Sequence, residues 1–286
     1  MPAISLLATN LVCYFMSLPW NQLFTQQIAC QPLAHLDTQF LLTGMPMWPN
    51  ARGLNELKAK ASLAQSSVSE FVCQSSLAAS DDYYEQIIYK RKQIPTRPNS
   101  WHDLFNGLVW LQYPKTKTLL NQLHIEDIEL HGLSPRTRQR NHITHFDECG
   151  VILTIECSTG EMVTELLRAH HWLEAMHEMR NAWGDTIHAR MFGHANYEML
   201  LNPFIGLTGK WLAVNVQKGF SQRSIAQQNA EIDACLPATI QNDGLFKQPK
   251  PLSPLPLLGL PGWSGLNQDP QFYHNREYFR PKRVRS

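Results

Sequence analysis

The chain has 286 residues, of which 25 are Lys or Arg and 24 are Asp or Glu, so its net charge is close to zero. This length suits one large domain or two small ones, and a near-neutral charge argues against nucleic acid or an anionic membrane as partners. The six cysteines are scattered without a CxxC pair, which argues against a zinc ribbon or a disulfide framework and fits a reducing compartment. We therefore expect a cytoplasmic protein.

Residues 2–16 form an apolar run that Thr9 and Asn10 interrupt. The run is too short to span a membrane, and it lacks the basic flank of a signal peptide, so a secretory signal is the less favoured alternative. We predict that residues 1–17 are a weakly ordered or non-native extension, with Met16 as an alternative start of translation.

The next part of the chain contains two predicted helices. Pro and Trp punctuate residues 18–49 and indicate short helical turns. Leu54–Leu63 and Tyr83–Lys92 carry apolar residues at helical spacing and predict helices. Residues 62–80 between them are rich in Ser, Ala and Gln and predict a mobile connection.

The stretch from Pro98 to His124 concentrates aromatic, ionisable and amide side chains around one helical period. Ser100 is the expected N-cap and Asp103 its acidic partner in a capping box, and a second helix is expected over Lys115–His124. His102, Asp103 and Asn106 then share a helix N-terminus, which favours anions. The alternative is structural: a cap, a buried amide and a histidine with one hydrogen bond.

The spacing of apolar residues changes after this predicted helix pair. Ile125–Leu130 alternates apolar and charged residues and predicts a short strand. Arg136, Arg138 and Arg140 also alternate, and would share one face of an extended segment. Such a face either binds phosphate or is a solvated edge, and the near-neutral net charge favours the edge.

A β-hairpin is predicted around the turn 147–150, with strands at Asn141–Phe146 and Val151–Cys157. His145 and Asp147 would point to one side of the first strand, and Glu148 to the other. A His and an Asp on one side can converge on a metal ion or a substrate proton. Ordinary turn chemistry, in which Asp147 binds the loop backbone, is the equal alternative.

Four helices are predicted in the following region: Glu161–Trp183, Asp185–Leu201, Leu207–Val216 and Ser221–Leu236. His194 and Glu198 lie one turn apart on an apolar side of the second. An ionisable pair on such a side needs a partner. The pair is either a core pair or part of a chemical site, with Glu198 as base or ligand.

Residues 249–286 are rich in proline and aromatic residues. The prolines forbid long helices, and the aromatics are too many for a disordered tail. We predict a strap that docks on a single helical domain over residues 18–248. Binding of the proline run to another protein is the alternative.

Four sequence blocks resemble one family. They are IPTRPNSWHDLFNGLVWLQYPKTKTLLNQLH (94–124), RNHITHFDECGVIL (140–153), FGHANYEMLLNPFIGLTGK (192–210) and PLLGLPGWSGLNQDPQFYHNREYFRP (256–281). Together they resemble the proteobacterial domain-of-unknown-function 3025 family and keep its order. The resemblance implies a bacterial, single-domain, non-secreted protein. The family has no assigned activity, so the resemblance implies nothing about the substrate.

The predicted fold class is α+β, mainly α, with a helical body, a small antiparallel β-hairpin and the C-terminal strap. The favoured function is an enzyme, a metal-assisted hydrolase using Zn, Mn or Fe. The alternatives are a non-enzymatic protein-binding or assembly module and, more weakly, a protein that contacts nucleic acid through basic residues that include Lys115 and Lys117. The candidate catalytic residues are His102, Asp103, Asn106, Glu148 and Glu198, and the candidate metal ligands are His145, Asp147 and His194.

Overall fold

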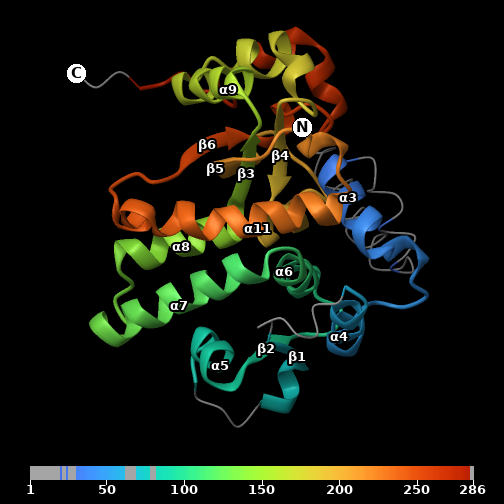
Figure 1. Cartoon of the computed structure of the whole chain (residues 1–286), viewed down its shortest axis with the longest axis vertical. Coiled ribbons are helices and arrows are strands. Elements are labelled where there is room, and N and C mark those ends of the chain that lie inside the picture. Colours follow the sequence, from blue (N-terminus) through green and yellow to red (C-terminus); the bar gives the residue numbers. More distant parts are fainter. Residues whose placement is uncertain (1–19, 21–23, 25–29, 62–68, 78–81, 284–286) are drawn as a thin grey trace, which may run out of the picture.

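The computed structural model describes residues 20, 24, 30–61, 69–77 and 82–283 (Figure 1). The predicted extension over residues 1–17, with its alternative start at Met16, lies outside the described residues. The division of the chain into an extension, a helical domain and a strap stays a prediction.

Helices form most of the described structure, and the predicted α+β class with mainly helical content is confirmed. The α-helices are α3 (Gln31–Phe40), α4 (Ala51–Lys60), α5 (Tyr84–Arg91), α6 (Trp101–Gln112), α7 (Pro114–His131), α8 (Arg138–Cys149), α9 (Ser158–Ala169), α10 (His194–Met199) and α11 (Ile225–Gln241). Short 3₁₀ helices lie at Leu42–Gly44, Gln74–Leu77, Arg180–Ala182, Phe220–Gln222, Asn242–Lys247, Leu257–Gly259, Gly265–Gln268 and Pro270–His274, with a π-helical turn at Glu174–Glu178. Within the described ranges, no helix is both long enough and apolar enough to cross a membrane.

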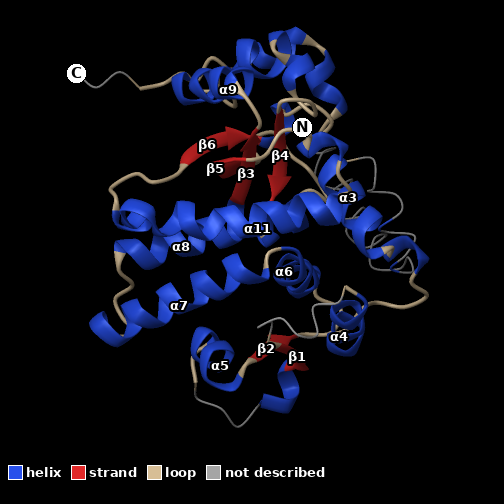
Figure 2. Ribbon diagram, viewed as in Figure 1, coloured by secondary structure: helices blue, strands red, loops and turns tan. Residues whose placement is uncertain are grey.

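A four-stranded mixed sheet lies among the helices (Figure 2). Its order is β4-β3-β5-β6, in which β3 pairs antiparallel with β4 and parallel with β5, and β5 pairs antiparallel with β6. Every residue of the central strand β3 is buried, and α8, α9 and α11 pack against the sheet. A separate parallel pair joins β1 and β2. The strands are β1 (Glu70–Cys73), β2 (Gln93–Thr96), β3 (Gly150–Ile155), β4 (Ile187–Met191), β5 (Thr208–Asn215) and β6 (Ser253–Pro256).

The predicted hairpin is wrong, although its second strand exists as β3. The residues assigned to the first strand and the turn form α8, which runs directly into β3 at Gly150. Ile143 and Phe146 are fully buried on one side of α8. A spacing of three residues puts both side chains on the same side of a helix, whereas in a strand they would lie on opposite sides.

Three other predicted elements are corrected. The strand at Ile125–Leu130 is the end of α7, because Ile125 and Ile128 are buried at helical spacing. The helix at Leu207–Val216 is strand β5, since a short apolar run fits either element. The helix at Asp185–Leu201 is β4 followed by α10.

The arginine segment is not an extended edge. Arg138 and Arg140 lie in α8, and Arg140 is only 1% exposed. Its Nε atom is 2.9 Å from Oδ1 of Asp127 on α7, and its Nη atoms donate to the carbonyls of Leu133 and Pro135. Arg140 therefore joins α7 to α8 inside the protein and offers no surface for phosphate.

The C-terminal residues pack on the remainder of the structure. Tyr273, Tyr278 and Phe279 are buried. The hydroxyl of Tyr278 donates to the carbonyl of Leu207 at 2.7 Å and accepts from the N–H of Leu258 at 2.9 Å. The segment contains short 3₁₀ turns where an extended strap was predicted.

Candidate functional site

Helix α6 brings His102 to the place where a buried helix meets the surface. The side chain of Ser100 accepts a hydrogen bond from the N–H of Asp103 at 3.3 Å, so the predicted N-cap is confirmed. All residues from 103 to 112 are buried. His102 stands in the first turn, with its side chain 34% exposed.

A backbone contact between two glycines sets the position of His194. Gly150 begins β3 and Gly193 precedes α10, and the N–H of Gly193 donates to the carbonyl of Gly150 at 2.8 Å. A Cβ on Gly193 would lie 2.5 Å from the carbonyl oxygen of Glu148, so the approach requires glycine. His194 follows at once and therefore lies beside Glu148.

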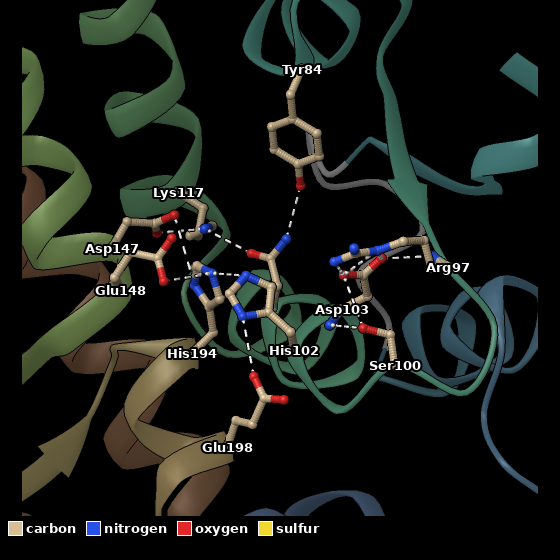
Figure 3. A network of polar contacts seen from close by, with 11 residues as sticks. Tyr84, Arg97, Ser100, His102, Asp103, Lys117, Asp147, Glu148, His194 and Glu198 are labelled. Atoms are coloured by element: carbon tan, nitrogen blue, oxygen red, sulfur yellow. Dashed lines mark hydrogen bonds and ion pairs between the residues drawn. The ribbon is translucent and has the colours of Figure 1, made fainter. Parts of the chain in front are cut away.

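His102, His194 and Glu148 meet between α6, α10 and α8 (Figure 3). The two Nε2 atoms are 3.1 Å apart, and Nε2 of His194 is 3.7 Å from Oε2 of Glu148. One ligand atom from each of the three residues lies within 4.8 Å of the other two. Neighbouring ligands of a tetrahedral zinc ion at about 2.1 Å are separated by roughly 3.4 Å, so the three atoms have the spacing of a metal site.

The other ring nitrogen of each histidine faces a carboxylate. Nδ1 of His102 is 3.3 Å from Oε2 of Glu198. Nδ1 of His194 is 3.8 Å from Oδ2 of Asp147, which is too long for a hydrogen bond. A carboxylate at Nδ1 favours the proton there and leaves the lone pair at Nε2. Without an ion, one Nε2 can donate to the other at 3.1 Å. With both ring protons at Nδ1, both lone pairs would point to the space that the two rings and Glu148 share.

Lys117, which the sequence suggests only as a residue that contacts nucleic acid, belongs to this network. It is 4% exposed, and its Nζ atom lies 2.5 Å from Oδ1 of Asp147 and 3.0 Å from Oδ1 of Asn106. Asn106 in turn donates to the hydroxyl of Tyr84 at 2.8 Å. Lys117 thus bridges Asn106 and Asp147, and it lies beside Asp147 in Figure 3.

A sequence signal for Lys117 does exist. Lys117, Asn121 and His124 recur at positions i, i+4 and i+7 of α7, and all three are buried. Polar residues at this spacing share one helix face. Such a face is buried only if its groups find partners, which the opposing helices α6 and α8 supply for Lys117.

Burial shifts the pKa values of several groups in the site. Burial lowers the pKa of His194 to about 3, against the opposing effect of Asp147, so its ring is neutral at neutral pH. Burial acts to raise the pKa of Asp147, but the charge of Lys117 and its hydrogen bond outweigh this effect, and the pKa is lowered. Burial raises the pKa of Glu148. A neutral imidazole beside carboxylates is the form that binds a metal ion.

Two of the predicted site residues do not join this group. Asp103 faces away from the histidines and pairs with Arg97, whose Nη2 is 2.7 Å from Oδ1. His145 is exposed on α8. The predicted convergence of His145 with Asp147 fails because residues two apart on a helix are separated by roughly 200° around its axis, whereas on the expected strand they would share a side.

Two hollows in the described surface lie away from the histidines. One, of 660 Å³, lies beside α4 and β1, and another, of 1340 Å³, lies between the 41–49 loop, α4 and α11. Neither is lined by His102, Glu148 or His194. The candidate ligands instead lie at the edge of the protein interior: the side chains of His102 and Glu148 are 34% and 35% exposed, whereas His194 is 4% exposed.

Comparison with known families places the sequence in a known group. Residues 69–283 match the family described as "Protein of unknown function (DUF3025)". Neither the curated proteins nor the solved structures gave a match. The match covers well over half of the sequence, and the chain therefore belongs to the DUF3025 family, as its four sequence blocks predict.

Proposed function

We propose that His102, His194 and Glu148 bind a divalent metal ion and that this ion serves a hydrolytic active site. One observation carries the proposal: both Nε2 atoms face each other beside Glu148, while both Nδ1 atoms face a carboxylate. Histidines that bind metals almost always place the second ring nitrogen against a carboxylate, a carbonyl or a water.

The donor set limits the metal. Two imidazoles and one carboxylate suit Zn²⁺, Mn²⁺ or Fe²⁺, and the absence of a thiolate from the group disfavours the softer ions. Three protein ligands leave a coordination position for water or substrate, as catalytic zinc sites do. The surface position of His102 and Glu148 leaves that side open to solvent.

The remaining groups would orient the ligands. Glu198 holds His102, and Asp147, fixed by Lys117, faces His194. A bound metal ion would supply a hydroxide at neutral pH by lowering the pKa of its water. Glu198 faces Nδ1 of His102, on the side of the ring away from the ion, so its role would be to orient His102.

Metal analysis tests the proposal directly. Tag-free protein, purified without chelators, is analysed for its metal content and titrated with Zn²⁺, Mn²⁺ and Fe²⁺ by calorimetry. We expect about one ion per chain. The variants H102A, H194A and E148Q should each lose the ion, and E198Q should weaken binding by about 10–100-fold, since it removes only an orienting partner.

H145A is the matched control, because His145 is exposed on the same helix as Glu148 and outside the group. It should bind the ion like the unaltered chain. Circular dichroism and thermal unfolding report whether each variant is folded. A folded protein that binds none of the three ions, or whose binding H145A abolishes and H102A spares, would contradict the proposal.

A further inference from the structure

The larger of the two hollows is a groove with an apolar floor. It has a volume of 1340 Å³ and lies between the 41–49 loop, α4, the start of α7 and α11. Its apolar lining from the loop, α4, α6 and α7 includes Phe40, Met45, Trp48, Leu57, Leu111 and Pro114. Ala226 and Ala230, two small exposed residues of α11, also line it. The groove is separate from the candidate metal ligands.

Leu41 lines this groove in a conformation that stability does not explain. Its φ of 52° and ψ of 43° lie in the left-handed region, and it is 70% exposed. A leucine in this region is an outlier because the backbone crowds its Cβ, and exposure forfeits the benefit of burial. Met47 on the same loop is 75% exposed. Apolar side chains left uncovered beside a groove, one of them on a strained backbone, indicate a binding surface.

Five ionisable side chains line the groove, and two of them are unpaired cations. Arg52 pairs with Glu56 at 3.0 Å. Asp233 accepts two N–H groups and a hydroxyl at the start of α7, so its charge is held by that helix N-terminus. The ammonium groups of Lys60 and Lys115 form no ion pair or hydrogen bond with any described residue. The groove therefore combines an apolar floor with an excess of positive charge.

We propose that this groove binds one long-chain carboxylate, a free fatty acid. The alkyl chain would lie on the apolar floor and cover Leu41 and Met47. The carboxylate would pair with the free ammonium groups of Lys60 and Lys115. A linear alkyl chain needs only apolar surface, whereas an extended peptide in the groove would also need partners for its backbone groups.

Calorimetry with the full chain tests the proposal, with dodecanoate below its micelle concentration as the probe. We expect one molecule per chain. The affinity should rise about fourfold for each CH₂ that is buried, so decanoate should bind about 15-fold more weakly than dodecanoate. Dodecyltrimethylammonium has the same chain and a cationic head group, and it should bind at least about tenfold more weakly than dodecanoate.

Variants of lining residues locate the site. A230F would fill the groove from an exposed position of α11 and should abolish binding. A234F is the matched control, because Ala234 is exposed one turn further along α11 and does not line the groove. K60Q/K115Q should weaken dodecanoate binding about tenfold and leave binding of the cationic amphiphile no weaker. K218Q, an exposed lysine outside the groove, should bind dodecanoate like the unaltered chain.

L41G separates binding from stability. Glycine relieves the left-handed backbone, so L41G should keep or raise Tm, while loss of the apolar contact should weaken dodecanoate binding several-fold. The proposal is overturned if the unaltered chain does not bind dodecanoate or binds several molecules of it, or if A230F and K60Q/K115Q bind it like A234F. Attachment to anionic phospholipid vesicles without binding of monomeric dodecanoate would also overturn it, because the ligand would then be a membrane surface.

Discussion

Breaking the buried pair of Asp127 and Arg140 should be one of the most destabilising single changes in this fold. Their side chains are 3% and 2% exposed, and Nε of Arg140 is 2.9 Å from Oδ1 of Asp127. Thr137 donates to the other carboxylate oxygen at 2.7 Å. D127A would leave the guanidinium buried beside only the carbonyls of Leu133 and Pro135.

The expected cost follows from these contacts. Loss of a hydrogen bond to a charged group costs about 1.5–3 kcal/mol, and removal of one partner of a buried ion pair costs about 3–5 kcal/mol in total. D127A should therefore lower the free energy of unfolding by about 3–5 kcal/mol. For a chain of this size the corresponding fall in Tm is roughly 5–10 °C.

Urea unfolding followed by circular dichroism measures this cost. The double variant D127L/R140M removes both charges and should recover most of the loss, because well-packed apolar residues replace buried ion pairs at little cost. The surface pair Arg52–Glu56, with side chains 88% and 59% exposed, is the control. E56A should change stability by less than about 1 kcal/mol. A loss below about 1 kcal/mol in D127A, or a double variant less stable than D127A, would refute the reasoning.

Three further changes test other parts of the structure. G193A should lower the free energy of unfolding by at least about 3 kcal/mol, because the new Cβ would lie 2.5 Å from backbone atoms at the end of α8. G44A is the control and should be neutral, because no atom lies within 4 Å of its new Cβ. Urea unfolding measures both variants, and equal effects would count against the backbone contact. Burial lowers the pKa of His124 to about 4, with Asp147 opposing and the charges of Arg136, Lys117 and Arg140 adding to the shift. Between about pH 6.5 and 4, His124 binds a proton in the unfolded state but not in the folded state. About 3 kcal/mol of stability should therefore be lost as the pH falls through this range. H124Q should flatten this part of the pH dependence of the unfolding free energy measured with urea. An unchanged slope would show that His124 does not cause the pH dependence. Y278F should cost about 1–3 kcal/mol, because the buried N–H of Leu258 loses its acceptor, while the carbonyl of Leu207 keeps the N–H of Leu257. Y89F, at a 41% exposed position, should cost almost nothing in urea unfolding, and similar losses for the two variants would contradict this reasoning.

The sequence predicts helices best where a cap and a long apolar face coincide. α6 is predicted correctly because Ser100 caps it and because Leu104, Leu108 and Leu111 recur at helical spacing. α8 is not, because Asp147 to Gly150 resembles a hairpin turn. The glycine there permits an immediate change from helix to strand, since a Cβ on Gly150 would lie 2.3 Å from the carbonyl oxygen of Phe146.

The same limits apply to the candidate site. His102, Glu148, His194 and Glu198 are predicted site residues that the structure brings together. Their meeting depends on the packing of α6, α8 and α10, which are far apart in the sequence, and no local pattern specifies it. Lys117 was missed because a lysine that is buried by tertiary contacts looks, in the sequence, like any surface lysine.

The glycine contact divides the three candidate ligands into a fixed pair and a movable one. Glu148 and His194 are joined through the main chain where α8, β3 and α10 meet, whereas His102 is carried by α6, which packs on α10 through side chains such as Phe105 and Tyr197, with ring centroids 5.4 Å apart. Side-chain packing yields to a smaller residue or to heat more readily than a backbone contact does. Any widening of the site would thus begin with the departure of His102, and an ion would be released through that single gap.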